Sequence, residues 1–178
     1  MFPFGRGKYI IPKGSSRSLA LSYDHIRKIV AYKGTASRER YRDLWLFSYL
    51  CNGINFRDML FLKYKNIIDG EICFLRSKTA RAYGGSKIIR AVITPEMMDI
   101  LRRWGNPYDG NPETLLFDYA DGATDMLSIS NTVRKVISMC NNALKKIAEE
   151  LGIPPFTTYS ARHSFATVHL RQGVHLTF

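Results

Sequence analysis

The longest regular pattern in the sequence is an amphipathic run that begins near Ser128 and continues for about six helical turns. Gly152 and the pair Pro154-Pro155 follow it, and such residues commonly mark the end of a helix. The sequence therefore predicts one long helix with a single apolar face, which must pack against the rest of the chain. The residues of that face are Ile129, Val133, Val136, Ile137, Cys140, Leu144, Ile147, Ala148 and Leu151.

Shorter patterns predict further helices. Ser22 is a suitable N-terminal cap for a first helix, and residues 36–51 form a second helical pattern, cationic early and apolar late. Gly53 interrupts this second pattern. The remaining helices are expected over about 56–60, from Pro95 after a cap at Thr94, and over about 158–172.

A small sheet is expected in the middle of the chain. The pair Asp69-Gly70 lies between the apolar residues Ile68 and Ile72, and this arrangement is a strong signal for a two-residue β-hairpin. A third strand is expected over 88–93, after a loop that spans 78–87. The predicted fold is mainly α with a small three-stranded antiparallel sheet, which is an α+β class.

The length of 178 residues suits one domain. Residues 1–18 mix glycine, proline and cations and contain few apolar residues, so they are expected to form a basic linker or arm. The domain itself is expected over residues 19–178.

The chain carries 26 Lys and Arg residues against 15 Asp and Glu residues, which gives a formal net charge of +11. Clustered cations neutralise phosphates and release counterions, so nucleic acid is the leading candidate partner. A basic helical domain that binds protein or RNA is an alternative at this level.

Neither a membrane-spanning run nor a secretory signal is found in the sequence. The three cysteines, Cys51, Cys73 and Cys140, are too few and too widely spaced for a disulfide framework or a metal site. They are expected to be small core residues in a reducing compartment, and the cytoplasm is the expected location.

The segment 158–167 contains the strongest candidate for chemistry. Arg162 and His163 are expected at the start of a helix, where the helix dipole and free N–H groups favour an anion. An arginine there can hold a phosphate through two hydrogen bonds. The alternative is a surface arginine beside a structural histidine.

Two further segments could contribute to such a site. Lys78 leaves a predicted strand for a glycine-rich loop, where it could act as a general acid or could simply be a solvated lysine. Residues 51–58 combine a helix break with polar groups, and Asp58 could serve either the site or the start of the next helix.

In this order, the three segments resemble the catalytic domain of the tyrosine recombinase (phage-type integrase) family, and most closely the integrases of Bacteroides-type mobile elements. The resemblance covers nearly all of residues 19–176. Residues 162–167 match the family's second arginine box, and residues 53–58 match the glycine and acidic positions of the first. Lys78 stands at the end of the second strand, where the family's catalytic lysine is expected.

The resemblance implies a site that cuts and rejoins a strand of duplex DNA. Arg162 would clamp the scissile phosphate, Lys78 would protonate the departing 5′ oxygen, and Asp58 would orient its neighbours. In the family a tyrosine attacks the phosphate and forms a 3′-phosphotyrosyl link, so neither a cofactor nor a metal ion is needed. The cations expected to contact DNA are Arg57, Arg76, Lys87 and Arg90.

The chain departs from the family at two site positions. Asn55 stands where the first box has its arginine, and Arg57, about 200° further round a helix, is not a simple substitute. Tyr159 stands three residues before Arg162, where most members carry a histidine, and it could hydrogen-bond the phosphate. His163 matches the histidine that commonly follows the arginine, and we expect it to be a structural hydrogen-bonding group.

The third departure concerns the nucleophile. The family's tyrosine lies some tens of residues beyond the second arginine box, whereas the last tyrosine here is Tyr159. We therefore expect a C-terminally truncated catalytic domain that binds duplex DNA but cannot cleave it alone. The family assembles as a tetramer on DNA, whereas this chain is expected to be monomeric. The alternative is a non-catalytic DNA-binding relative that acts as a regulatory factor.

Overall fold

The structure, a computed structural model, describes residues 20–76, 88–120 and 122–171. The expected linker, residues 1–18, lies outside these ranges. The described chain is mainly helical with one small antiparallel sheet, as the sequence predicts. The helices are α1 (Tyr23–Ala31), α2 (Ala36–Leu50), α3 (Phe56–Leu60), α4 (Pro95–Trp104), α5 (Met126–Leu151) and α6 (Thr158–Arg171), with short 3-10 helices η1 (Tyr64–Asn66) and η2 (Asp118–Ala120). The strands are β1 (Ile67–Ile68), β2 (Glu71–Leu75) and β3 (Ile88–Val92).

The sheet is an antiparallel meander with the strand order β1-β2-β3. Ile68 pairs with Glu71, so the turn between β1 and β2 consists of Asp69 and Gly70. Their φ angles are 51° and 77°, and a type I′ turn requires this left-handed conformation at both central residues. The hairpin prediction is therefore confirmed.

Helix α5 confirms the predicted long helix but begins at Met126, slightly before the expected start at Ser128. Asp125 caps the helix, because its carboxylate accepts hydrogen bonds from the N–H groups of Leu127 and Ser128 at 2.8 and 3.0 Å. Gly152 ends it in the left-handed conformation, with φ at 60°. The buried residues are mostly those of the predicted apolar face: Val133, Val136, Cys140, Ala143, Leu144, Ile147 and Ala148.

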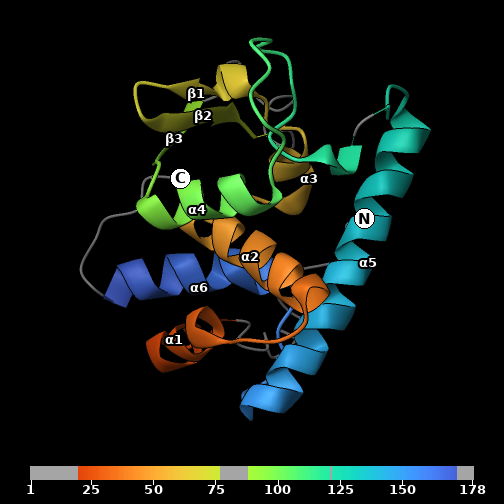
Figure 1. The fold of residues 1–178 in the computed structure, drawn as a ribbon. Coiled ribbons are helices and arrows are strands. Elements are labelled where there is room, and N and C mark those ends of the chain that lie inside the picture. The colour runs from red at the N-terminus through yellow and green to blue at the C-terminus, as the bar shows by residue number, and fades with distance from the viewer. Residues whose placement is uncertain (1–19, 77–87, 121, 172–178) are drawn as a thin grey trace, which may run out of the picture.

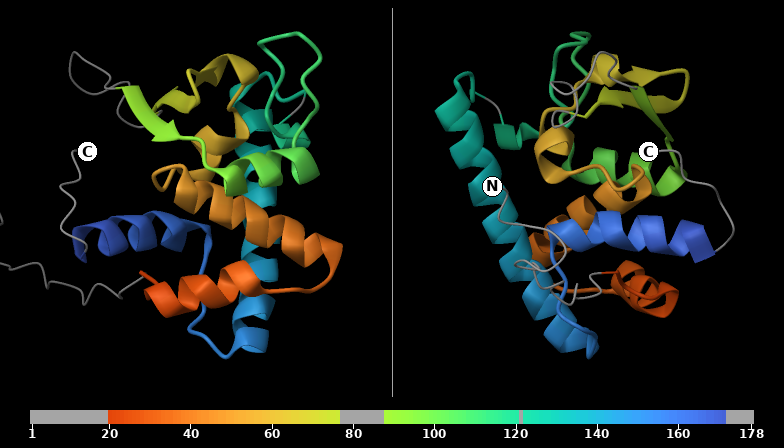
Figure 2. Two further views of the ribbon diagram at one scale, coloured as in Figure 1. Left: turned by 60° about the vertical axis from the view of Figure 1, so that its left-hand side comes forward. Right: turned by 180° about the vertical axis from the view of Figure 1, so that it is seen from behind.

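Helix α2 runs through the middle of the molecule (Figure 1). The sheet lies at one end and α1 at the other, with α4, α2 and α6 between them, while α5 runs along one side (Figure 2). Leu44, Trp45 and Phe47 of α2 are fully buried. The Trp45 indole donates from Nε1 to the carbonyl oxygen of Thr157 at 3.0 Å, which joins α2 to the start of α6.

The cationic part of α2 contains a buried ion pair that the sequence pattern does not predict. Arg42 and Asp43 are 3% and 1% exposed, and their Nε and Oδ1 atoms lie 2.7 Å apart. Arg42 also donates from Nη1 to the carbonyl oxygen of Tyr32 at 2.6 Å. Asp43 accepts a hydrogen bond from Trp104 Nε1 and pairs with Arg103, both at 2.7 Å. This polar cluster joins α2 to α4 and to the α1–α2 connection.

Candidate functional site

The chain turns sharply between α2 and α3. Asn52 and Gly53 have φ angles of 53° and 65°, so two consecutive residues adopt the left-handed conformation. The Ser48 hydroxyl donates to the carbonyl oxygen of Ile54 at 2.5 Å and holds the turn against the end of α2. The predicted helix break at Gly53 is therefore a tight corner, which we call the Asn52-Gly53 corner.

Helix α6 packs directly against this corner at Arg162. A Cβ atom added to Gly53 would lie 2.8 Å from the Cα atom of Arg162, closer than real Cβ atoms come to such a neighbour. Arg162 Nη1 donates to the Gly53 carbonyl oxygen over 3.3 Å, although the two residues are 109 positions apart in sequence. The structure thus brings together the two segments 53–58 and 162–167.

The Arg162 guanidinium lies in surroundings that suit an anion. Burial lowers the pKa of Arg162, and the positive charge of Arg76 lowers it further, whereas Tyr159 and Asp58 act in the opposite direction. Arg76 directly follows β2, so the end of this strand, the corner and α6 all approach one guanidinium. A phosphate there would replace lost hydration and reduce the repulsion between the two cations.

Arg162 and His163 lie in the second turn of α6. The helix begins at Thr158, whose N–H donates to Asn141 Oδ1 at 2.8 Å. Because the favourable charge of a helix N-terminus falls off within the first turn, it contributes little at Arg162. The expectation that these two residues sit at a helix start is therefore wrong, and any attraction for an anion comes from the Arg162 side chain.

Asn55 is the N-terminal cap of α3. Its Oδ1 accepts a hydrogen bond from the Asp58 N–H at 2.9 Å, and its Nδ2 donates to Asp58 Oδ2 at 2.5 Å. Both ends of the amide are thus occupied within the cap, a role that asparagine commonly performs. Asp58 is only 8% exposed, and this pair fixes its orientation.

Tyr159 and His163 stand one turn apart on α6 and pack ring against ring. Their ring centroids are 4.6 Å apart and the rings are steeply inclined, at 70°. Tyr159 is 58% exposed, so its hydroxyl is accessible to a ligand. His163 Nε2 is buried and has no hydrogen-bond partner among the described residues. Within the described residues, the His163 ring therefore packs against the Tyr159 ring.

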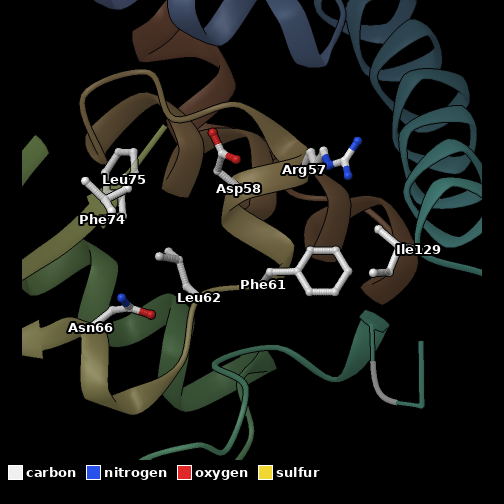
Figure 3. A pocket seen from close by; sticks show the side chains of 8 residues that line it. All are labelled: Arg57, Asp58, Phe61, Leu62, Asn66, Phe74, Leu75 and Ile129. Atoms are coloured by element: carbon white, nitrogen blue, oxygen red, sulfur yellow. The ribbon is translucent and has the colours of Figure 1, made fainter. Parts of the chain in front are cut away.

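Arg57 lines a hollow beside α3 that also includes Asp58. Figure 3 shows its guanidinium directed towards α5, whereas the Asp58 carboxylate points away from it. Asp58, but not Arg57, is among the groups that act on the pKa of Arg162. The hollow has a volume of about 290 Å³ and is lined by Arg57, Asp58, Phe61, Leu62, Asn66, Phe74, Leu75 and Ile129.

Of the other expected DNA contacts, Arg76 follows β2 and Arg90 lies on β3. Arg90 on β3 pairs with Glu71 at 3.2 Å. The carbonyl oxygen of Arg90 accepts a hydrogen bond from Asn52 Nδ2 at 2.8 Å, so the corner also contacts the sheet. Lys78 and Lys87 lie outside the described residues.

Sequence analysis does not single out Asn52, although this residue joins the corner to β3. The signal that could have found it is the dipeptide Asn52-Gly53, because asparagine and glycine are the residues that most readily adopt the left-handed conformation.

The three cysteines are free and buried, which confirms the prediction that they are core thiols. Burial raises the pKa of Cys51, next to the corner, to about 12, so this thiol remains protonated at neutral pH. In the described ranges, no three His, Cys, Asp or Glu side chains are grouped so as to hold a metal ion. Nor does any helix of the described chain have the length and apolar character needed to cross a membrane.

A comparison with protein-family models, curated proteins and solved structures finds no match to the chain. The candidate site is therefore defined by its own features: the Gly53 carbonyl accepts a hydrogen bond from the guanidinium of Arg162, and the charges of Arg76, Tyr159 and Asp58 influence the Arg162 pKa.

Proposed function

We propose that the chain is a DNA-binding catalytic domain of the tyrosine recombinase type, in which Arg162 holds a backbone phosphate. The observation that carries this proposal is the contact between Gly53 and Arg162, with Arg76 close enough to influence the Arg162 pKa. The three residues belong to segments far apart in sequence, and a merely basic surface gives no reason for them to meet. Their convergence supports a single phosphate site.

Arg162 is suited to this role by its chemistry and its setting. The Gly53 carbonyl fixes the orientation of the guanidinium, whose planar fork matches two oxygens of one phosphate. Partial burial strengthens the attraction, because charges interact more strongly where water is excluded. The net charge of +11 adds a long-range attraction for DNA.

The proposed reaction of such a recombinase is strand transfer through a tyrosine. Its oxygen would form a bond to phosphorus as the bond to the 5′ oxygen breaks, and Lys78 would give that oxygen a proton. The exposed Tyr159 would donate a hydrogen bond to the phosphate. Since no tyrosine follows Tyr159 in the 178-residue sequence, we expect this chain to bind DNA without forming a covalent adduct.

A binding titration tests the phosphate contact. The affinity for a short mixed-sequence DNA duplex, measured by fluorescence anisotropy, should fall steeply as salt is added. Arg162→Ala should weaken binding about tenfold and lower the slope of log affinity against log salt by about one, because one phosphate contact is lost.

Arg38→Ala is the matched control for this titration. Arg38 is also a partly buried arginine, with a side chain 31% exposed, but it lies in the first turn of α2 whereas the corner follows the last turn. Its loss removes the same charge and should change the affinity less than about twofold, because Arg38 is paired with Glu150 and salt screens charges that lie far from the DNA. An Arg162→Ala variant that binds as well as the Arg38→Ala variant would overturn the proposed site.

The cap at Asn55 favours a second candidate, a DNA-binding protein without strand-cleaving activity. Because both ends of the Asn55 amide are bound to Asp58, this position offers no second clamp for the phosphate. The source gene distinguishes the two candidates: a reading frame that continues past Phe178 to a histidine-containing stretch and a tyrosine supports the recombinase, and a stop codon supports the binding protein. A covalent adduct between the 178-residue chain and a nicked duplex would contradict both.

A further inference from the structure

The Asn52-Gly53 corner contacts both the sheet and α6 through adjacent residues. We propose that Asn52 is a positioning residue for Arg162: its side-chain amide anchors the corner to β3, so that the Gly53 carbonyl holds the guanidinium in place. This inference rests on the proposed phosphate site and names a residue outside the segments that the resemblance assigns to it.

The side chain of Asn52 contacts the sheet at strand β3. The Ile93 N–H donates to the Gly70 carbonyl, and backbone groups alternate in direction along a strand, so the carbonyl of Arg90 faces the open edge of β3. Asn52 Nδ2 donates to this oxygen at 2.8 Å. The side chain of Asn52 thus satisfies a carbonyl on the open edge of β3.

The corner contacts α6 through Gly53 and Arg162. Gly53 follows Asn52 directly, and its carbonyl oxygen accepts the hydrogen bond from Arg162 Nη1. The corner and α6 are also in close contact at this point, because only a residue without a Cβ fits beside the Arg162 backbone. A shift of the corner away from β3 would therefore move the acceptor that orients the guanidinium.

Arg76 is the second cation of the site, and its position depends on the sheet. β2 and β3 pair in continuous register from Glu71 with Val92 to Leu75 with Ile88, and Arg76 follows the last of these pairs. By anchoring the corner to β3, Asn52 also fixes the position of the end of β2 relative to α6. Such an anchor is useful because the positive charge of Arg76 acts on the Arg162 guanidinium, so the electrostatics of the site depend on where the end of β2 lies.

Asparagine suits the backbone conformation of Asn52. Asn52 has a φ angle of 53°, a conformation in which asparagine is common and most other residues are strained. Asn52→Gly therefore removes the amide while keeping the backbone conformation accessible. This variant is expected to fold, which thermal unfolding of each protein checks before binding is measured.

The experiment is a double-mutant cycle on DNA binding with the full 178-residue chain. The four proteins are the parent, Asn52→Gly, Arg162→Ala and the double variant, each titrated with the same mixed-sequence duplex over a range of salt concentrations. We expect Asn52→Gly to lose about fivefold in affinity, the typical effect of one lost hydrogen bond. We expect the double variant to bind no more weakly than Arg162→Ala, because the amide acts through that guanidinium.

Asp69→Gly is the matched control. It also removes a side chain from a left-handed residue, with φ at 51°, but in the β1–β2 turn, and it should not weaken binding, since it removes a negative charge. Full affinity in Asn52→Gly, or losses that simply add in the double variant, would overturn the positioning role while leaving the phosphate site intact. An Arg162→Ala variant without effect would instead overturn the proposed function, and this inference with it.

Discussion

A single methyl group should disturb the site at Gly53. Gly53→Ala would put a Cβ atom 2.8 Å from the Arg162 Cα atom and an L side chain at a φ angle of 65°. We expect the free energy of unfolding to fall by about 2–4 kcal/mol, because left-handed strain and a backbone clash act together. Urea denaturation of the parent and the variant measures this loss.

Gly70→Ala separates the two causes. Gly70 has a φ angle of 77°, but nothing lies within 4 Å of its added Cβ atom, so only the strain of about 1–2 kcal/mol is expected. If the two variants lost the same free energy, the corner would not be pressed against α6, and the geometric basis of the candidate site would be wrong.

At the scale of single residues, the sequence indicates which residue types matter but not what they touch. Arg162, Asn55 and Asp58 are identified by their chemistry and by the family resemblance. The use of Asn55 as a helix cap follows from its position one residue before Phe56, the first residue of α3. That Asn52 bonds to Arg90 could not be predicted, because an amide side chain has many possible partners until the sheet is placed.

At the scale of elements, local patterns explain the successes. The hairpin at Asp69-Gly70 and helix α5 are specified by turn chemistry and by apolar spacing over consecutive residues. The burial of α2 is different, because neighbours contact it on several sides. Its buried residues therefore follow no simple helical period and include Arg42 and Asp43.

Breaking the buried Arg42–Asp43 pair should destabilise the protein strongly. Asp43→Asn would leave the Arg42 guanidinium, 3% exposed, without its buried counter-ion. We expect a loss of about 3 kcal/mol in the free energy of unfolding, since breaking one partner of a buried pair leaves an uncompensated charge. Chemical denaturation measures the loss.

Asp118→Asn provides the comparison for this prediction. Asp118 pairs with Arg40 at 3.1 Å, but its side chain is 60% exposed, so the expected loss is below about 1 kcal/mol. Equal losses in the two variants would mean that burial of the α2 pair has no special effect on stability.

At the scale of the whole molecule, the candidate site depends on contacts that no local pattern specifies. Gly53 and Arg162 are 109 positions apart, and they meet because α2 and α6 pack together through Trp45 and the start of α6. The sequence identified the segments, and their resemblance to one family predicted that they serve one site. The packing of helices brings Gly53 to Arg162 and places Asp58 and Tyr159 where they influence its pKa, whereas Arg57 lines the hollow beside α3 without such an influence.

The distribution of charge and apolar surface bears on the state of the free protein. A net charge of +11 repels copies of the chain from one another. Among the described residues, the large apolar side chains that remain exposed are scattered over several elements. They are Tyr23 and Val30 on α1, Ile68, Leu75, Ile88 and Val92 on the sheet, Met98 on α4, Tyr108 in a loop, Met126, Leu127 and Met139 on α5, and Tyr159 on α6. We therefore expect a monomer without DNA, and sedimentation velocity at moderate salt measures this.

A stable dimer or tetramer without DNA would contradict this expectation, and one variant would then locate the contact. Val92 is 66% exposed at the end of the edge strand β3, on the sheet face that also carries Ile88. Val92→Asp places a charge on that face and should leave a monomer unchanged in both sedimentation and thermal stability, because exposed substitutions usually have little effect. An oligomer that dissociated in this variant would instead show that copies of the chain contact each other through this face of the sheet. The burial of apolar area there would then outweigh the repulsion between chains that each carry a net charge of +11.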